Sequence, residues 1–156
     1  MREQLRSFIS AIGEDAVAII PAAHEATRSY DTEYKFRQDS DFAYLTGFPE
    51  PDAVAVLRPG QSESYLLYVR PRDPEMETWF GRRQGVDGAV KNFNAHRAES
   101  VERFFDDLPS LLDGHEKLYY RFGVDHKLDL RIIEYLSGQR QRRLKTPHPP
   151  HTIIDP

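Results

Sequence analysis

Apolar side chains recur along the chain with spacings that predict a series of helices and strands. Between residues 2 and 12 they follow the helical i, i+3, i+4, i+7 pattern, at Leu5, Phe8, Ile9 and Ile12. Gly13 then fits the end of that helix. Residues 16–20 form a short, continuous apolar run that Pro21 ends, which is typical of a strand buried on both faces.

Three further strands are predicted in quick succession, over residues 42–47, 53–57 and 64–69. The segments that join them, 49–52 and 58–61, carry turn-forming proline, aspartate and glycine. Both segments are short enough to connect antiparallel neighbours. The pattern therefore predicts a three-stranded meander.

The middle of the chain is less regular. Residues 70–83 are interrupted by two prolines and a glycine, and we expect them to be irregular. Residues 86–92 indicate a helical turn, and residues 93–97 give a weak strand signal.

Helical spacing returns in the last third. Ser100 is placed to cap a helix over residues 101–112, and residues 117–122 predict another strand. Residues 128–136 predict a second amphipathic helix, which Gly138 would close.

This order of elements predicts an α/β fold with a mixed β-sheet flanked by helices. Residues 146–156 contain four prolines and cannot form a helix, so we expect an extended linker there. The predicted organisation is one domain over residues 1–145 and the start of a linker over residues 146–156.

Composition narrows the class of protein. A chain of 156 residues with 39% hydrophobic and 29% charged residues suits one globular domain. A net charge of −4 argues against nucleic-acid binding, because duplex binders carry a basic excess. The absence of cysteine excludes disulfides and thiol catalysis, and no apolar run is long enough to cross a membrane. We therefore expect a cytoplasmic protein.

Residues 28–47 combine five aromatic rings with two arginines and several short polar side chains. We expect a structured loop over residues 28–41 that leads into the strand at 42–47. Arg37 offers a planar fork of donors, and the polar residues after it are suited to capping or turning the backbone: Gln38, Asp39, Ser40 and Asp41. The alternative is a loop that is well held by its own hydrogen bonds and has no catalytic or binding role.

Catalytic chemistry gives no clear signal. The six histidines include no His-Glu-x-x-His pair, and two prolines separate His148 from His151. Asp39 and Asp41 could be paired metal-binding carboxylates of a hydrolase or nuclease, although a capped turn explains them equally well. The nucleotide-binding and serine-hydrolase motifs are also missing. We expect no metal site and no catalytic centre on this chain.

Residues 79–83, Trp-Phe-Gly-Arg-Arg, form a second cluster of interest. A tryptophan supplies a large flat contact, and arginines supply forks that bind carboxylates. The cluster therefore suits a recognition edge. The alternative is that Trp79 anchors the segment in the core.

The two clusters together resemble the N-terminal domain of aminopeptidase P, the X-Pro aminopeptidase of the pita-bread metallopeptidase class. The first motif is carried by Arg28, Asp31, Tyr34, Arg37, Gln38, Asp39, Ser40, Asp41, Tyr44 and Gly47. The second motif is Trp79-Phe80-Gly81-Arg82-Arg83. The closing Ile153-Ile154-Asp155 is similar to the family's interdomain boundary.

The resemblance implies a ribonuclease H-like fold and a non-catalytic role for this chain. In the family, two Mn²⁺ ions lie in a C-terminal catalytic domain, which removes the N-terminal residue from peptides with proline second. The cofactor expectation is therefore none on this chain and two Mn²⁺ in the catalytic domain.

The resemblance also implies partners. They are the catalytic domain of the same protein, further copies in a homo-oligomer, and a peptide substrate, with no nucleic acid or membrane. Trp79 would border the active site of a neighbouring subunit, and Arg142 or Arg143 would contact the peptide there. The alternative is a free-standing interaction module derived from this domain.

Overall fold

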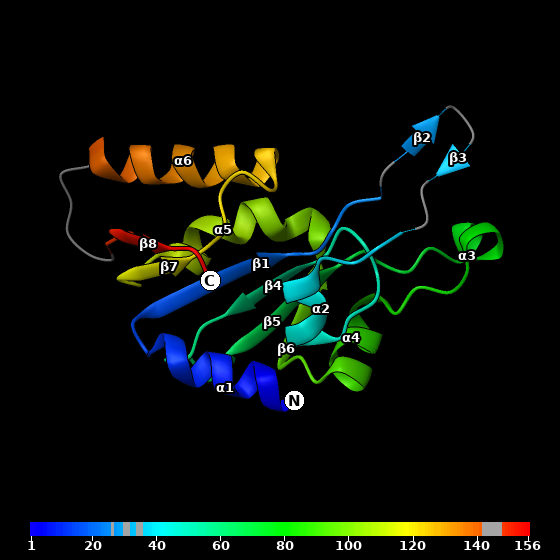
Figure 1. The fold of residues 1–156 in the computed structure, drawn as a ribbon, viewed down its shortest axis with the longest axis horizontal. Coiled ribbons are helices and arrows are strands. Elements are labelled where there is room, and N and C mark those ends of the chain that lie inside the picture. The colour runs from blue at the N-terminus through cyan, green and yellow to red at the C-terminus, as the bar shows by residue number, and fades with distance from the viewer. Residues whose placement is uncertain (26, 30–31, 34–35, 142–147) are drawn as a thin grey trace.

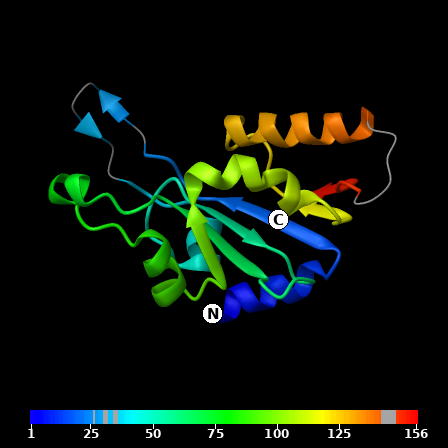
Figure 2. The same ribbon diagram turned by 180° about the vertical axis from the view of Figure 1, so that it is seen from behind.

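The computed structural model describes residues 1–25, 27–29, 32–33, 36–141 and 148–156, with backbone alone at 27–29, 32–33, 80 and 141. Its centre is a six-stranded mixed sheet with helices on both faces (Figures 1 and 2). The strands, in their spatial order, are β6 (Arg97–Ser100), β5 (Tyr65–Val69), β4 (Val54–Leu57), β1 (Ala16–Pro21), β7 (Lys117–Tyr119) and β8 (Thr152–Ile154). The predicted mixed α/β fold is confirmed.

Pairing directions explain why the sheet is mixed. β4 lies between β1 and β5 and is antiparallel to both, whereas β7 is parallel to β1 and β6 is parallel to β5. A three-stranded meander is therefore present, but its strands are β1, β4 and β5. A separate ribbon, β2 (Thr27–Ser29) with β3 (Thr32–Glu33), lies at one end of the molecule (Figure 1).

Helices cover the two faces of the sheet unequally. One face carries α1 (Glu3–Ile12), α2 (Ser40–Thr46) and α4 (Gly85–Phe93). The other carries α5 (Phe104–Leu112), which the short 3₁₀ turn η1 (Val101–Arg103) precedes, and α6 (His126–Gln141). The remaining helix, α3 (Pro74–Phe80), projects at the same end as the β2–β3 ribbon (Figures 1 and 2).

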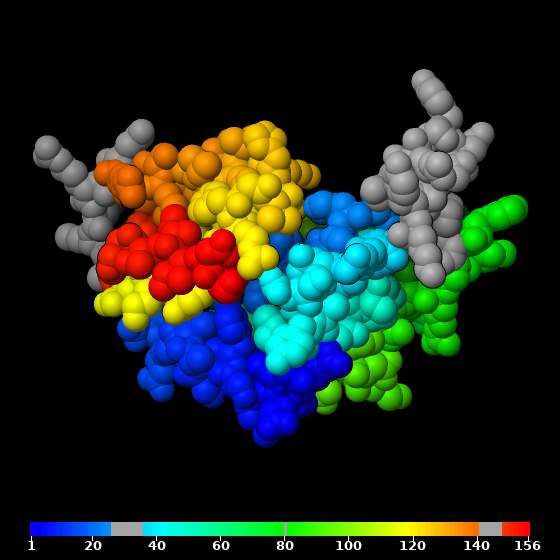
Figure 3. Space-filling model, in the orientation of Figure 1, coloured from blue at the N-terminus to red at the C-terminus, as the bar shows by residue number. Residues whose placement is uncertain are grey.

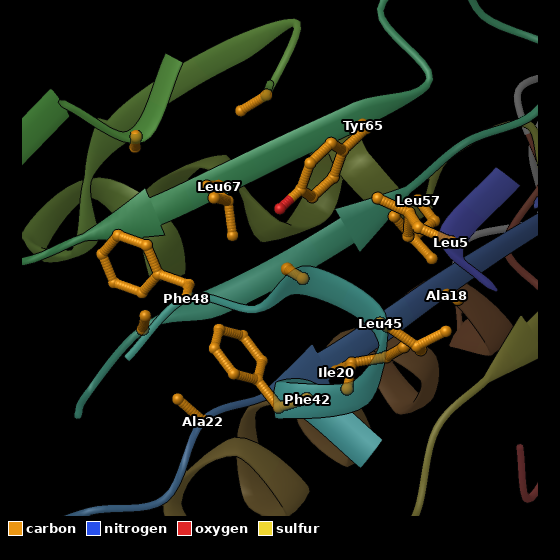
Figure 4. Packing of buried hydrophobic residues seen from close by; sticks show 14 of the residues in the cluster. Leu5, Ala18, Ile20, Ala22, Phe42, Leu45, Phe48, Leu57, Tyr65 and Leu67 are labelled. Atoms are coloured by element: carbon orange, nitrogen blue, oxygen red, sulfur yellow. The ribbon is translucent and has the colours of Figure 1, made fainter. Parts of the chain in front are cut away.

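The central strand β1 contributes side chains to both layers of the core. Ala16, Ala18 and Ile20 pack beneath α1 and α2, while Val17 and Ile19 point toward α5 and α6. This alternation on a two-sided strand is what the continuous apolar run predicted. Figure 4 shows Phe42 and Leu45 from α2 packed above the sheet beside Ile20.

The prediction of a strand over residues 42–47 is wrong, because the segment forms α2. Asp39 caps the helix by accepting the backbone N–H groups of Asp41 and Phe42 at 3.0 and 2.9 Å. Gly47 ends it in the left-handed conformation, with φ of 69°. Hydrogen bonds thus satisfy backbone groups at both ends of the helix. Phe42 and Leu45, spaced i and i+3, reach the core from one face of it.

Other boundaries also differ from the sequence predictions. The supposedly irregular segment contains α3, because Asp73 caps it by accepting two backbone N–H groups and Pro74 fits its first turn. Ser100 caps η1 as predicted, by accepting the N–H of Glu102. Gly138 lies inside α6 and does not end it. The predicted strands at 93–97 and 117–122 occupy 97–100 and 117–119.

The final residues also depart from the linker that their composition predicted. Residues 152–154 form β8, which pairs in parallel with β7 as an edge strand of the sheet. Their extended conformation agrees with the prediction, but this part of the segment belongs to the domain. In the described part of the chain, no helix has the length and hydrophobicity needed to cross a membrane.

Candidate functional site

The polar motif before α2 ties several backbone segments together. The side-chain oxygen of Gln38 accepts the N–H groups of Ala23 and Asp39, both at 2.9 Å. Its side-chain nitrogen donates to the carbonyls of Phe48 and Glu50, at 3.3 and 2.9 Å. Gln38 thus joins the end of β1 to both ends of α2. Of the residues expected to cap or turn the backbone, Gln38 and Asp39 bond backbone groups in this way.

Asp39 and Asp41 are engaged in separate interactions. Asp39 is the helix cap, whereas an oxygen of Asp41 lies 2.7 Å from Nη1 of Arg121. Arg121 also reaches Asp155, with Nε 2.9 Å from its carboxylate. These hydrogen bonds, first that to Asp155 and then that to Asp41, raise the pKa of Arg121. The two aspartates therefore have different partners, Asp39 the backbone of α2 and Asp41 the side chain of Arg121.

The other residues of the first motif have different roles. Arg37, Ser40 and Tyr44 are exposed, and 62% of Tyr44 is accessible to solvent. Gly47 donates its N–H to the carbonyl of Ala43 at the end of α2. Arg28 lies in β2 with its side chain outside the described part. Asp31 and Tyr34 lie outside the described residues, and so do Arg142 and Arg143.

Trp79 is a surface residue, with 82% of it exposed at the projecting helix α3. The alternative that it anchors the core is therefore wrong. Gly81 ends α3, and Arg82 and Arg83 follow it. These two arginines line an open hollow of about 530 Å³ together with Arg72 and Lys91, among other residues. An exposed aromatic ring thus lies on α3, and cationic side chains that follow α3 in the chain line the hollow.

Part of this positive charge is neutralised locally. Arg72 makes a two-pronged contact with Glu77, with distances of 2.7 and 2.8 Å. That pairing lowers the pKa of Glu77 and raises the pKa of Arg72. Arg83 donates to the carbonyl of Pro71 at 3.4 Å. Arg82 is exposed, so its guanidinium is accessible to an anionic ligand.

His24 forms a cluster that no sequence motif indicated. Its Nδ1 lies 2.6 Å from Asp52, and its Nε2 lies 3.0 Å from Asp125. The hydrogen bond to Asp52 is the largest cause of a raised His24 pKa. Because the two carboxylates bind opposite nitrogens of one ring, they do not converge on a common point as the ligands of one metal ion do.

Two further observations bear on catalysis. Ser64 Oγ lies 3.4 Å from His96 Nδ1, but the same nitrogen accepts the N–H of Tyr65 at 3.1 Å. It is therefore not free to take a proton from the serine. Across the described ranges, no three histidine, aspartate or glutamate side chains are arranged to hold a metal ion.

Comparison with known proteins connects these features. The family model for the aminopeptidase P N-terminal domain matches residues 1–120. The Xaa-Pro aminopeptidase of Escherichia coli is 36% identical over 152 residues, which is 96% of this chain and 34% of the relative. That of Haemophilus influenzae is 46% identical over 97 residues, or 62% of this chain and 23% of the relative.

The same likeness extends to solved structures. Aminopeptidase PepP from Pseudomonas aeruginosa superposes with a TM-score of 0.89 and 37% identity, covering 97% of this chain and 35% of that one. Nearly the whole of this chain thus aligns with about a third of the length of the E. coli and P. aeruginosa proteins. With the family model covering residues 1–120, the chain belongs to the aminopeptidase P N-terminal domain family.

Proposed function

We propose that this chain is the non-catalytic N-terminal domain of an X-Pro aminopeptidase, in which it serves assembly and borders the active site of a neighbouring subunit. The observation that carries the second role is the exposure of Trp79 on a projecting helix. A ring of that size is normally buried or placed in an interface. Further support comes from the relatives, because the two aligned along nearly the whole of this chain extend far beyond it.

The recognition edge would act by positioning the substrate. The ring of Trp79 would pack flat against the downstream part of a bound peptide, and an adjacent arginine fork would hold a carboxylate. Arg82 is exposed and follows α3 directly. We also propose Arg142 or Arg143 for this role, on the family resemblance alone. Such contacts act only on peptides long enough to reach them.

The chemistry belongs, in this proposal, to a catalytic domain outside the present chain. Two Mn²⁺ ions would lie there and activate the attacking water. In this proposal the present chain contributes position and assembly only. We place the enzyme in the cytoplasm, which the absence of cysteine permits.

The test is Trp79→Ala in the full-length enzyme, assayed with an X-Pro dipeptide and with longer X-Pro peptides. We expect turnover of longer peptides to fall roughly tenfold, which corresponds to about 1.4 kcal/mol of lost contact, with the dipeptide little changed. Leu130→Ala is the matched control, because Leu130 is also exposed but lies on α6. Equal turnover of both substrates by Trp79→Ala would refute the bordering role.

Two tests use the isolated chain, and a third reads the messenger that encodes it. Turnover of an X-Pro peptide by this chain with Mn²⁺ would refute the non-catalytic role. Binding of Mn²⁺ or Mg²⁺ that Asp39→Asn or Asp41→Asn abolishes would support the metal-dependent hydrolase. A free-standing interaction module predicts instead a messenger that encodes no metallopeptidase after residue 156.

A further inference from the structure

An apolar hollow opens on the face of the sheet that carries α1 and α2. It has a volume of about 210 Å³. Its lining includes Phe8 from α1, Ile20 from β1, Tyr44 and Leu45 from α2, and Val124 from the loop before α6, together with Pro156. Figure 3 shows the face on which the C-terminal residues (red) lie near α1 (blue) and α2 (cyan).

Two of the side chains that line this hollow are largely exposed. Tyr44 is 62% accessible to solvent and Val124 is 60% accessible. Neighbouring residues on the same helix are used differently, since Phe42 and Leu45 are buried in the core. Tyr44 is therefore a motif residue that the fold of the domain does not bury. An aromatic ring and an aliphatic side chain beside one hollow form an apolar surface that suits a protein contact.

A polar clamp fixes one edge of the hollow. Arg121 binds Asp41 at the start of α2 and Asp155 near the end of the chain, at 2.7 and 2.9 Å. It also donates to an oxygen of Pro156 at 3.3 Å. The last residues of the domain are thereby held against the hollow. A polar rim around an apolar centre is the usual anatomy of a protein interface.

The position of Pro156 indicates the occupant. The Escherichia coli and Pseudomonas aeruginosa relatives match nearly all of this chain with about a third of their own length. In an enzyme with this fold, residues that follow the matched domain begin at the rim of the hollow. A domain joined to the chain at this point would have a high effective concentration at this face.

We propose that the hollow lined by Phe8, Tyr44 and Val124 is the docking surface for the catalytic domain of the same polypeptide. The contact would be an apolar group of that domain inserted between Tyr44 and Val124, with the Arg121 clamp at its edge. This inference rests on the proposed function, and it adds the surface through which the two domains are joined.

The experiment places a charge in the hollow of the full-length enzyme, with Tyr44→Asp and Val124→Asp as separate variants. The matched controls are Leu130→Asp and Ile133→Asp, because these residues are 46% and 48% exposed on α6, across the sheet. Each variant is first made in the isolated chain, where unchanged thermal unfolding shows that the domain still folds. Val124 lies in a loop, so its variant remains informative if Tyr44→Asp unfolds the domain.

Docking is read from the rate of limited proteolysis at the junction after residue 156. We expect Tyr44→Asp and Val124→Asp to speed cleavage there by roughly tenfold, while the α6 controls cleave at the wild-type rate. Cleavage of the hollow variants at the wild-type rate would overturn the proposal. A changed oligomer size with unchanged cleavage would assign the hollow to a second copy and would also overturn it.

An assay of X-Pro peptide cleavage distinguishes failure of this inference from failure of the proposed function. A wild-type full-length protein that does not cleave X-Pro peptides would refute the proposed function, whatever the proteolysis shows. If the junction of that protein is nevertheless protected, and the hollow variants lose the protection, the docking surface stands. If X-Pro cleavage is present and the hollow variants keep full junction protection, the docking surface alone is refuted.

Discussion

Nε2 of His24 lies 3.0 Å from a carboxylate oxygen of Asp125, which is 101 residues further along the chain. The other nitrogen of the ring lies 2.6 Å from Asp52. Asp125 also accepts the N–H of Leu128 at 3.0 Å and so caps α6. Asp52 holds a positive φ of 55°, an unusual conformation for a residue other than glycine. The His24 ring therefore links the segment after β1, the turn before β4 and the start of α6.

This linkage predicts that part of the domain's stability depends on pH. The pKa of His24 is raised, because the imidazolium form donates to both carboxylates. A raised folded-state pKa gives stability that is fully present below the unfolded value of 6.5 and is lost as pH rises through the folded pKa. We expect His24→Gln to destabilise the domain in mild acid by less than about 1 kcal/mol, since the side chain is largely exposed.

The measurement is urea unfolding of wild type and His24→Gln across a pH series from mildly acidic to alkaline. The difference between the two free energies of unfolding should shrink as pH rises. Other groups face the same cluster, chiefly Asp52, Asp125 and Arg70, whose guanidinium lies 3.8 Å from Asp52. Burial lowers the pKa of His115, which opposes the trend in each protein but cancels in the difference. A difference that grows with pH would contradict the assignment.

Gln38 gives a second prediction, because it satisfies backbone groups on both sides of α2. Gln38→Ala removes bonds to Ala23, Phe48 and Glu50 and leaves partly buried backbone groups without partners. We expect a loss of about 1–3 kcal/mol in the free energy of unfolding, measured with urea. Arg37→Ala is the neighbouring control and should change stability by no more than about 0.5 kcal/mol, since Arg37 is exposed. A larger loss for Arg37→Ala than for Gln38→Ala would reverse this assignment.

Periodicity was enough to predict the centre of the fold. The apolar runs that became β1, β4 and β5 are buried along almost their whole length, and helical spacing identified α1 and α5. It failed at α2, because residues 42–47 are short and aromatic enough to suit a strand as well. The cap at Asp39 and the stop at Gly47 decided that case, and both signals were visible in the sequence.

The candidate site was less predictable, because long-range contacts define it. The sequence identified Trp79 and the first motif, but not which side chains would face solvent. Arg121 and His24 carried no motif, and their partners lie far away along the chain. Such pairings follow from sheet topology, which local patterns do not specify. β8 was missed for a related reason: parallel pairing with β7 stabilises a strand that is largely exposed and rich in neighbouring prolines.

Gly47 supports a third prediction, because both its backbone and its surroundings favour glycine. Its φ is 69°, and a Cβ added there would lie 2.9 Å from Nη1 of Arg2. That nitrogen donates to the carbonyls of Ala43 and Tyr44, at 2.8 and 3.1 Å, and so completes the end of α2. We expect Gly47→Ala to lower the free energy of unfolding by about 1–2 kcal/mol through the left-handed backbone, with a further loss from the displaced arginine.

The matched control is Gly138→Ala, since Gly138 lies inside α6 with open space around it. That substitution should stabilise the domain by about 0.5–1 kcal/mol, because alanine is the better helix former. The double variant Arg2→Ala/Gly47→Ala separates the two costs of Gly47→Ala, since a residual loss without the arginine belongs to the backbone. If Gly47→Ala is as stable as wild type, the end of α2 is not held in the left-handed conformation. The placement of Tyr44 at the hollow would then lose its structural basis, because the same helix end positions that side chain.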